Sequence, residues 1–425
     1  MSKKICIDFG SSFTKVAVRE DWNVQTQMAR FDAPVVQSAP DAESQICVPS
    51  IVFKSLRQGR EEWFFGAVAM GLRAGDGLKA YRNWKNHFVM PQDEPPEDDL
   101  LEAAGQFFRW LHGVVRQHPI LGAYADSPLR VCVPDFERLG PWRSWFRLVL
   151  AMAGWKLDRD FLITEPYANL IGALTLARNC THVEEDGRRF PTMLGMFDSE
   201  QGLLAAIRRS PGNVQSYAAL IIDVGAFTTD FGYVWWEDVN DVTKPNFATR
   251  SERLGVRQKV DDQIVTVLTP DERRLLEDLN AFQFESMKRN ILRGEPYAII
   301  QGGSQHIIGT PQHFEALRAI TTAFAQEIMK ETERFMGAQR ALPNTVLFTG
   351  GGLQIPRVEE QLAQYFRGKG IEVFDLRSEE RYNWRMNDPL SREEQLERNR
   401  LLIRTGSAVG GCSVYVDSGG GGPII

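Results

Sequence analysis

One pattern of residues occurs twice in this chain, and it limits the possible folds more than any other feature. The second copy covers residues 218–234 and reads AALIIDVGAFTTDFGYV, with an apolar run that ends at Asp223, a glycine turn and a second apolar run. The first copy covers residues 5–18 and reads ICIDFGSSFTKVAV. Apolar runs on either side of a glycine turn predict two strands that pair as a hairpin. Two such hairpins predict two related halves whose turns face one cleft.

The residues of the two turns suit a metal-bound phosphate. Asp8 and Asp223 occupy equivalent positions, and a glycine follows each of them two residues later. Carboxylates bind divalent cations, and turn amides and hydroxyls bind phosphate oxygens. Lys15 takes the position of Asp230 in the first copy, so one hairpin would bring a cation to the phosphates and the other a carboxylate to the metal. An ordinary hairpin with a polar tip is the alternative for either copy alone.

Composition and charge exclude several classes of protein. A chain of 425 residues with 43% hydrophobic and 24% charged residues is long enough for two domains and is not disordered overall. The net charge of −6 gives no reason to expect a nucleic-acid partner. The five cysteines are scattered and form no Cys-x-x-Cys pair, which favours reduced thiols. The sequence has no recognisable signal peptide or membrane segment, so we expect a cytoplasmic protein.

A third motif, at residues 346–358, reads VLFTGGGLQIPRV. It predicts a strand, a turn at Gly350, Gly351 and Gly352, and a helix from Pro356. Glycines at such a turn let the backbone approach a flat base closely. The spacing is neither that of a Rossmann dinucleotide site nor that of a Walker loop.

Taken in order, these three motifs resemble those of the actin-like ATPase superfamily, which includes actin, sugar kinases and heat-shock chaperones. The third motif is similar to the adenosine motif of the DnaK-type, seventy-kilodalton chaperones, so their ATPase domain is the closest resemblance. The resemblance implies an α/β fold with two related lobes around a central nucleotide cleft, each a mixed sheet flanked by helices. It also implies ATP or ADP with Mg²⁺ as ligands, and slow magnesium-dependent ATP hydrolysis.

The resemblance implies roles for residues of the two hairpins. Mg²⁺ would be held, directly or through waters, by Asp8, Asp223 and Glu165, and Asp223 or Asp230 would position the attacking water. The phosphates would be cradled by Gly10, Ser11, Ser12, Gly225 and Thr228. Ala226 and Phe227 replace glycines of the chaperone turn, so hydrolysis is expected to be lost more readily than binding.

Two further stretches resemble chaperone motifs. Residues 79–89, KAYRNWKNHFV, lie where the chaperones place a lysine on the γ-phosphate, and Lys85 is the first choice with Lys79 second. A solvated basic loop is the alternative. Glu165 and Pro166 resemble the first connecting motif, whose glutamate lies near the metal's water shell; the alternative is a helix-start acid followed by a first-turn proline.

The remaining nucleotide contacts fall in the second half of the chain. Gly255 lies where the relatives have a glycine turn beneath the phosphates, and Val256 replaces their second glycine. Glu285, Lys288 and Arg289 share one helical face and resemble the chaperones' adenosine clamp, in which the glutamate bonds the ribose and the basic pair packs over adenine. Exposed charges on a helix are more often simply solvated.

We expect the following organisation. Lobe I would cover residues 1–176 with a small outer subdomain at about 35–128, and lobe II residues 177–400 with an insertion at about 178–216 and an outer subdomain at about 257–318. Residues 401–416 would return as a helix to lobe I, and the glycine-rich tail 417–425 would be flexible. The peptide-binding domain of the chaperones has no counterpart in this sequence.

The predicted function is a chaperone-like nucleotide switch that changes lobe closure between its ATP and ADP states to control a protein partner. Such a switch would be a monomer or a nucleotide-dependent oligomer. The alternative is a filament-forming, actin-like cytoskeletal or partition protein, because the spacing from Asp8 to Lys15 resembles that of filament proteins. A small-molecule kinase is less favoured, since no acceptor site is visible.

Overall fold

The structure is a computed structural model. It describes residues 3–20, 48–57, 60–75, 77–82, 84–89, 96–118, 121–135, 142–170, 183–185, 188–190, 217–236, 246–301, 303–375 and 406–412. Most of the insertion expected at residues 178–216 and all of the tail 417–425 lie outside these residues. The described chain is a mixed α/β structure, as expected from the sequence.

The first hairpin opens a five-stranded sheet with the order β3-β2-β1-β7-β8. The predicted strands are β1 (Lys3–Phe9) and β2 (Phe13–Glu20), and they pair antiparallel. On one side β2 pairs with β3 (Val48–Pro49), while β1 pairs in parallel with β7 (Leu129–Val133), which is followed by β8 (Leu157–Thr164). The central strand β1 is buried because neighbours cover it on both sides.

The second hairpin opens a sheet of the same design. It consists of β11 (Tyr217–Val224) and β12 (Thr229–Trp236), and the sheet order is β13-β12-β11-β16-β17. Its other strands are β13 (Asn246–Glu252), β16 (Thr345–Thr349) and β17 (Glu372–Asp375). As in the first sheet, two antiparallel pairings are followed by two parallel pairings. The sequence repeat is therefore a repeat of sheet topology.

Helices cover the first sheet with a largely aromatic core. They are α2 (Lys85–Val89), α3 (Asp98–Gln117) and α4 (Trp142–Met152). The apolar residues of α3 recur every three to four positions and face the sheet, and two acids in its first turn suit the helix dipole. The rings of Phe9 and Trp84 lie 4.7 Å apart at the centre of this core.

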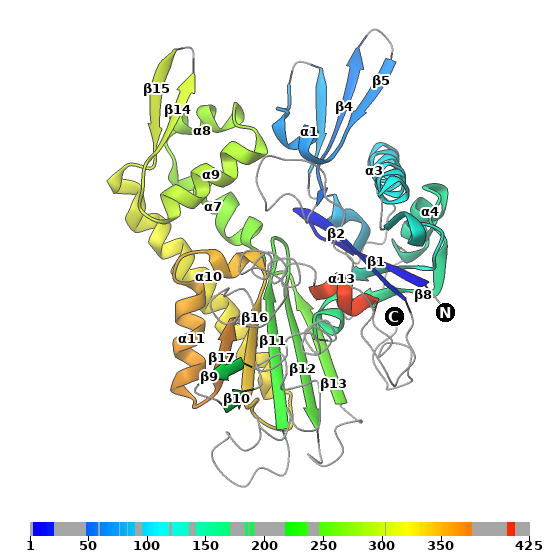
Figure 1. Cartoon of the computed structure of the whole chain (residues 1–425). Coiled ribbons are helices and arrows are strands. Elements are labelled where there is room, and N and C mark those ends of the chain that lie inside the picture. The colour runs from blue at the N-terminus through cyan, green and yellow to red at the C-terminus, as the bar shows by residue number, and fades with distance from the viewer. Residues whose placement is uncertain are drawn as a thin grey trace.

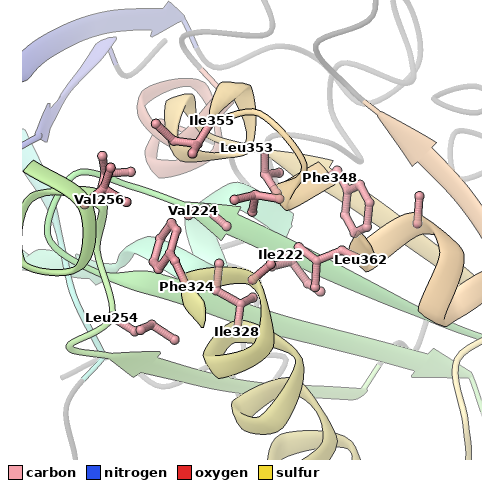
Figure 2. Packing of buried hydrophobic residues seen from close by; sticks show 14 of the residues in the cluster. Ile222, Val224, Leu254, Val256, Phe324, Ile328, Phe348, Leu353, Ile355 and Leu362 are labelled. Atoms are coloured by element: carbon pink, nitrogen blue, oxygen red, sulfur yellow. The ribbon is translucent and has the colours of Figure 1, made fainter. Parts of the chain in front are cut away.

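The second sheet is covered by the long helix α10 (Pro311–Gly337) and by α11 (Val358–Gly368). Figure 2 shows how its core is filled: Ile222 and Val224 of β11 lie beside Phe324 and Ile328 of α10. Phe348 and Leu362 continue the cluster toward α11. Burying each such side chain contributes about 1.5–3 kcal/mol, so this core fixes the position of the hairpin that ends at Asp223.

Smaller elements stand above each sheet (Figure 1). Above the first are β4 (Val52–Arg57), β5 (Arg60–Phe64), α1 (Gly66–Gly71) and β6 (Leu78–Tyr81). Above the second are α8 (Pro270–Glu277), α9 (Ala281–Leu292), β14 (Tyr297–Gln301) and β15 (Ser304–Ile308). The two groups touch, because Phe282 of α9 packs against the cluster that contains Phe53 and Met70.

Short elements complete the described chain. They are η2 (Leu121–Tyr124), β9 (Val183–Glu185), β10 (Arg188–Phe190), the π-helix η4 (Arg257–Asp261), α7 (Asp262–Val267), η5 (Gly351–Gln354) and α13 (Gly406–Gly411). We refer to the elements from β1 to β8, with α13, as the first half, and to those from β11 to β17 as the second half. Among the described helices, none has the length and apolarity needed to span a bilayer.

Three cysteines that are far apart in sequence meet beneath α13. Cys6 of β1, Cys132 of β7 and Cys412 are buried and free, and the sulfurs of Cys6 and Cys132 lie 3.6 Å apart. Burial raises the pKa of the Cys6 thiol well above its ordinary value, so this sulfur is a poor nucleophile. These three thiols form no disulfide in the structure and pack in the interior.

Candidate functional site

The turn of the first hairpin is held by a local network. Ser50 donates to the carbonyl of Gly10 at 2.6 Å, and its hydroxyl lies 2.8 Å from that of Thr14. A Cβ at Gly10 would lie 2.2 Å from the carbonyl oxygen of Phe13, so this turn closes only with glycine. Ser12 is exposed at the tip, and Ser11 is partly so.

Two lysines and two carboxylates pair within the first half. Lys15 Nζ lies 2.8 Å from Asp8 Oδ2, and Lys85 Nζ forms an ion pair with Glu165, at which a helix begins directly after β8. Asp8, Lys85 and Glu165 are buried. The structure thus brings Lys85 to the acidic centre and not Lys79, which pairs with Asp99 on the surface.

Asp223 lies beside this group and connects it to α13. Asn169 Nδ2 donates to Asp223 Oδ2 at 2.7 Å, and Ser407 Oγ donates to Asn169 Oδ1 at 2.6 Å. Because Ser407 occupies the amide oxygen, the amide nitrogen of Asn169 is fixed toward the carboxylate. As a residue Asp223 is only partly buried, whereas Asp8 and Glu165 are buried.

Asp230 is enclosed instead. It pairs across the hairpin with Asp223, in the register that joins Lys15 to Asp8 in the first hairpin. Thr228 Oγ1 donates to one carboxylate oxygen of Asp230 at 3.0 Å, and Ser251 donates to the other. Both oxygens are therefore used by hydroxyl groups, and the side chain braces the turn.

Ser251 also joins the two sheets. The backbone NH of Asp135, just after β7, donates to Ser251 Oγ at 2.7 Å, and the NH of Ser251 donates to the carbonyl of Asp135 at 2.9 Å. Thr249 adds a hydrogen bond to the Asp135 carboxylate. The end of β7 is in this way attached to β13 directly beside Asp230.

Desolvation and mutual repulsion dominate the electrostatics of this centre. Burial is the main cause that raises the pKa of Glu165 and of Asp223, and the nearby charge of Asp8 raises both pKa values further. Burial likewise raises the pKa of Asp230 well above its ordinary value, with help from Glu165 and Asp223. Among the described residues, the ion pairs of these four carboxylates are those with Lys15 and Lys85, so ionising all four would leave two negative charges (four minus two) uncompensated.

The turn of the second hairpin rests on the segment that follows β13. The NH of Gly225 donates to the carbonyl of Thr228 at 2.8 Å, and a Cβ at Gly255 would lie 2.3 Å from the carbonyl carbon of Phe227. Gly255 therefore lies beneath this turn, as the resemblance implies. Val256, which replaces a glycine of the relatives, is buried in the core of the second sheet and leaves the turn intact.

The three residues expected to form an adenosine clamp lie on α9, where Lys288 and Glu285 form an ion pair with each other. Lys288 is buried, and its Nζ lies 2.8 Å from Glu285 and 3.1 Å from Asp261. Glu285 and Arg289 are exposed on the same helix. The lysine is thus occupied by two acids, while Glu285 and Arg289 remain accessible to a ligand.

The three glycines of the third motif lie against the second hairpin. Gly350 has φ of 92°, and a Cβ there would lie 2.2 Å from Asp223 Oδ1. Gly352 packs equally closely on Val224, whereas a Cβ at Gly351 would meet nothing within 4 Å. Beside them is a cavity of about 380 Å³, lined by Leu353, Gln354, Ile355, Pro356, Arg357, Glu359 and Glu360.

Sequence reasoning missed the residues that support the carboxylates. Asn169 lies in the stretch after Glu165, which gave a local signal without indicating its partner. Asp135 and Ser251 had no signal, and Ser407 lies in the segment expected to return to lobe I, with no signal for its partner. These contacts join segments more than a hundred residues apart. Such contacts depend on how the sheets are placed and not on any local pattern.

The carboxylates of this site suit a cation whose other ligands are waters and phosphate oxygens. Within the described ranges, no group of three or more His, Cys, Asp or Glu side chains is arranged to hold a metal ion unaided. Magnesium characteristically takes one or two carboxylates together with waters and phosphates, and the excess negative charge of the centre favours it.

No protein-family model matches the chain, and no curated protein matches it either.

Proposed function

We propose that the chain is an ATP-binding nucleotide switch that hydrolyses ATP slowly, with the two-lobed actin-like ATPase fold and a DnaK-like ATPase module as its closest resemblance. The observation that carries the proposal is the repeated sheet, which ends its central strand at Asp8 in one half and at Asp223 in the other. The charge of Asp8 acts on Asp223 and on Glu165, so the three carboxylates share one centre. ATP or ADP with Mg²⁺ would lie between the halves, whose closure would control a protein partner.

The charges support magnesium as the companion of the nucleotide. Asp8, Asp223 and Glu165 would hold Mg²⁺ directly or through waters, and the divalent ion would favour the ionised forms of Glu165 and Asp223, whose pKa values burial raises. When bound, the ion would neutralise charge that develops on the phosphates. Lys15 and Lys85, each already paired with a carboxylate, would turn their remaining donors toward phosphate oxygens.

The two aspartates of the second hairpin would have different roles. Asp223 is the less buried of the two residues, so we assign it the orientation of the attacking water. Asp230 would keep Thr228 and the turn in place through its hydroxyl contacts. Slow turnover follows, because Ala226 and Phe227 allow the turn fewer conformations than glycines would.

The test is titration calorimetry of the whole chain with ATP and with ADP, in magnesium and in EDTA. We expect magnesium to strengthen ATP binding in the wild type, and Asp8→Ala to reduce that strengthening by at least about tenfold, or about 1.4 kcal/mol. ATP binding in EDTA should not weaken, because Lys15 is then free to meet a phosphate. The matched control is Asp126→Ala, which removes an exposed carboxylate paired with Arg116 on the surface.

A wild type that binds neither nucleotide would refute the proposed function. If Asp8→Ala kept the full effect of magnesium, the nucleotide site would stand but Asp8 would not be a metal ligand.

A filament-forming protein is the second candidate, and one surface favours it. The outer face of the β14–β15 hairpin exposes Ile300 at 80% and Ile307 at 53%, and the hairpin projects from the second half (Figure 1). Apolar side chains on an unpaired hairpin suit contact with a second copy of the chain. A steep, concentration-dependent rise in light scattering on adding ATP would favour the filament over the monomeric switch.

A further inference from the structure

The lysines that the proposed function places near the nucleotide are already paired with acidic side chains. Lys15 pairs with Asp8, Lys85 with Glu165, and Lys288 with both Asp261 and Glu285. These pairs add little net positive charge to the space between the halves. A nucleoside triphosphate keeps net negative charge even with Mg²⁺ bound, so its outermost phosphate requires cations from elsewhere.

Two arginines supply such cations. Arg82 follows β6 directly, and Arg257 is the first residue of η4. Both side chains are exposed, and within the described chain neither guanidinium forms a hydrogen bond or an ion pair. Asp261, the acid nearest in sequence to Arg257, forms an ion pair with Lys288, and the charge of Arg257 acts on it as well.

The two arginines belong to different halves of the chain. The NH of Arg257 donates to the carbonyl of Ala226 at 2.8 Å, so this arginine is fixed to the turn of the second hairpin. The guanidinium carbon of Arg82 lies 5.9 Å from the centre of the Phe53 ring. Phe53 belongs to the cluster that meets Phe282, so Arg82 lies where the first half touches the second.

Helix α9 connects the surroundings of the two arginines. Its Phe282 packs against the cluster that contains Phe53, and its Lys288 lies 3.1 Å from Asp261, one helical turn after Arg257.

Desolvation lowers the pKa of Arg82, and the charge of Arg257 lowers that pKa further. Like charges brought together from two halves of a chain oppose the closure of those halves. An anion between them would reverse the sign of the interaction.

We propose that Arg82 and Arg257 together clamp the outermost phosphate of a nucleoside triphosphate across the two halves of the chain. The inference rests on the proposed function and adds a basis for distinguishing ATP from ADP. Each guanidinium offers a planar fork of donors that matches two phosphate oxygens. With a diphosphate the clamp is empty, and the two arginines repel each other.

The experiment is calorimetric titration of ATP and ADP, both with Mg²⁺, into the wild type, Arg82→Ala, Arg257→Ala and the double variant. Arg318→Ala, which removes an exposed arginine from the surface of α10, is the matched control. We expect each single variant to weaken ATP binding at least about tenfold and to change ADP binding by less than about twofold. The double variant should lose less than the product of the two single losses, because the arginines act on one phosphate.

Arg257→Lys separates loss of the fork from loss of the charge. It should weaken ATP binding less than Arg257→Ala does, because the charge remains. Thermal unfolding of every variant should match that of the wild type, since both side chains are exposed.

The outcomes are distinguishable. If ATP and ADP weaken equally, if ATP is unaffected, or if only one of the two arginines matters, the clamp is wrong while the nucleotide site stands. If the wild type binds neither nucleotide, the proposed function is wrong and the clamp falls with it.

Discussion

At the scale of single residues, the site is built from carboxylates whose burial works against their charge. Asp230 is the extreme case, because it is enclosed and spends both oxygens on Thr228 and Ser251. The hydrogen bond from Ser251 favours the ionised form of Asp230, but burial outweighs it and raises the pKa. Burying Asp230 costs free energy, but its hydrogen bonds with Thr228 and Ser251 hold the turn that would face a phosphate.

The pH dependence of the stability of Asp230→Asn measures the free-energy cost of burying this carboxylate. Burial raises the pKa of Asp230 in the folded protein, so the stability gained from its proton is fully present below the unfolded pKa and is lost as pH rises through the folded pKa. Asparagine does not titrate. The stability of Asp230→Asn relative to the wild type should therefore be more favourable at about pH 8 than at about pH 5, by about 1.4 kcal/mol for each pH unit of that interval that lies below the folded pKa.

Urea unfolding at both pH values measures this difference, with Asp126→Asn as the exposed control. A difference between Asp230→Asn and the wild type that does not depend on pH would show that Asp230 carries no such penalty.

At the scale of elements, the glycine turn after β16 is required by packing against the second hairpin. Gly350 has a positive φ, and Asp223 Oδ1 and the backbone of Val224 occupy the space of a Cβ. Its neighbour Gly351 faces open space. The two positions look alike in the sequence, and only the structure separates them.

Gly350→Ala should be destabilising, and Gly351→Ala should not. The first change forces a strained backbone and a clash with the Asp223 carboxylate, so we expect it to lower the free energy of unfolding by at least about 1–3 kcal/mol. Gly351→Ala is the matched control and should stay within about 0.5 kcal/mol of the wild type. Chemical denaturation measures both, and equal effects would contradict the assigned role of Gly350.

The elements were predictable from sequence where their signals are local. Both hairpins, α3 and α10 follow from apolar periodicity and from turn residues within a few positions. The partners of Lys85 and Asp223 were not predictable, because each contact joins segments brought together only by the sheets. For the same reason, cysteines that look scattered in the sequence meet beneath α13.

At the scale of the whole molecule, the two halves are joined beside the site as well as at their outer elements. Ser251 connects Asp135 of the first half with Asp230 of the second. A movement of one sheet against the other would break hydrogen bonds of a residue that braces the second turn. Any movement of the two halves would therefore be coupled to the geometry of this turn.

Ser251→Ala should weaken this connection. The change leaves one oxygen of Asp230 and the NH of Asp135 without partners, so we expect the free energy of unfolding to fall by about 1–3 kcal/mol. Hydrogen exchange should quicken at the end of β7 and along β13 together. Ser304→Ala, at an exposed position of β15, is the control, and protection that is lost in only one half would contradict the coupling.

The position of α13 has a consequence for how the chain folds during translation. The whole second sheet, residues 217–375, leaves the ribosome before α13, which covers β1, β2 and β7. The second sheet can therefore assemble while the face of the first sheet that α13 covers is still exposed. Until α13 docks, the sulfurs of Cys6 and Cys132 lie open on the nascent chain, and its arrival seals them from oxidants.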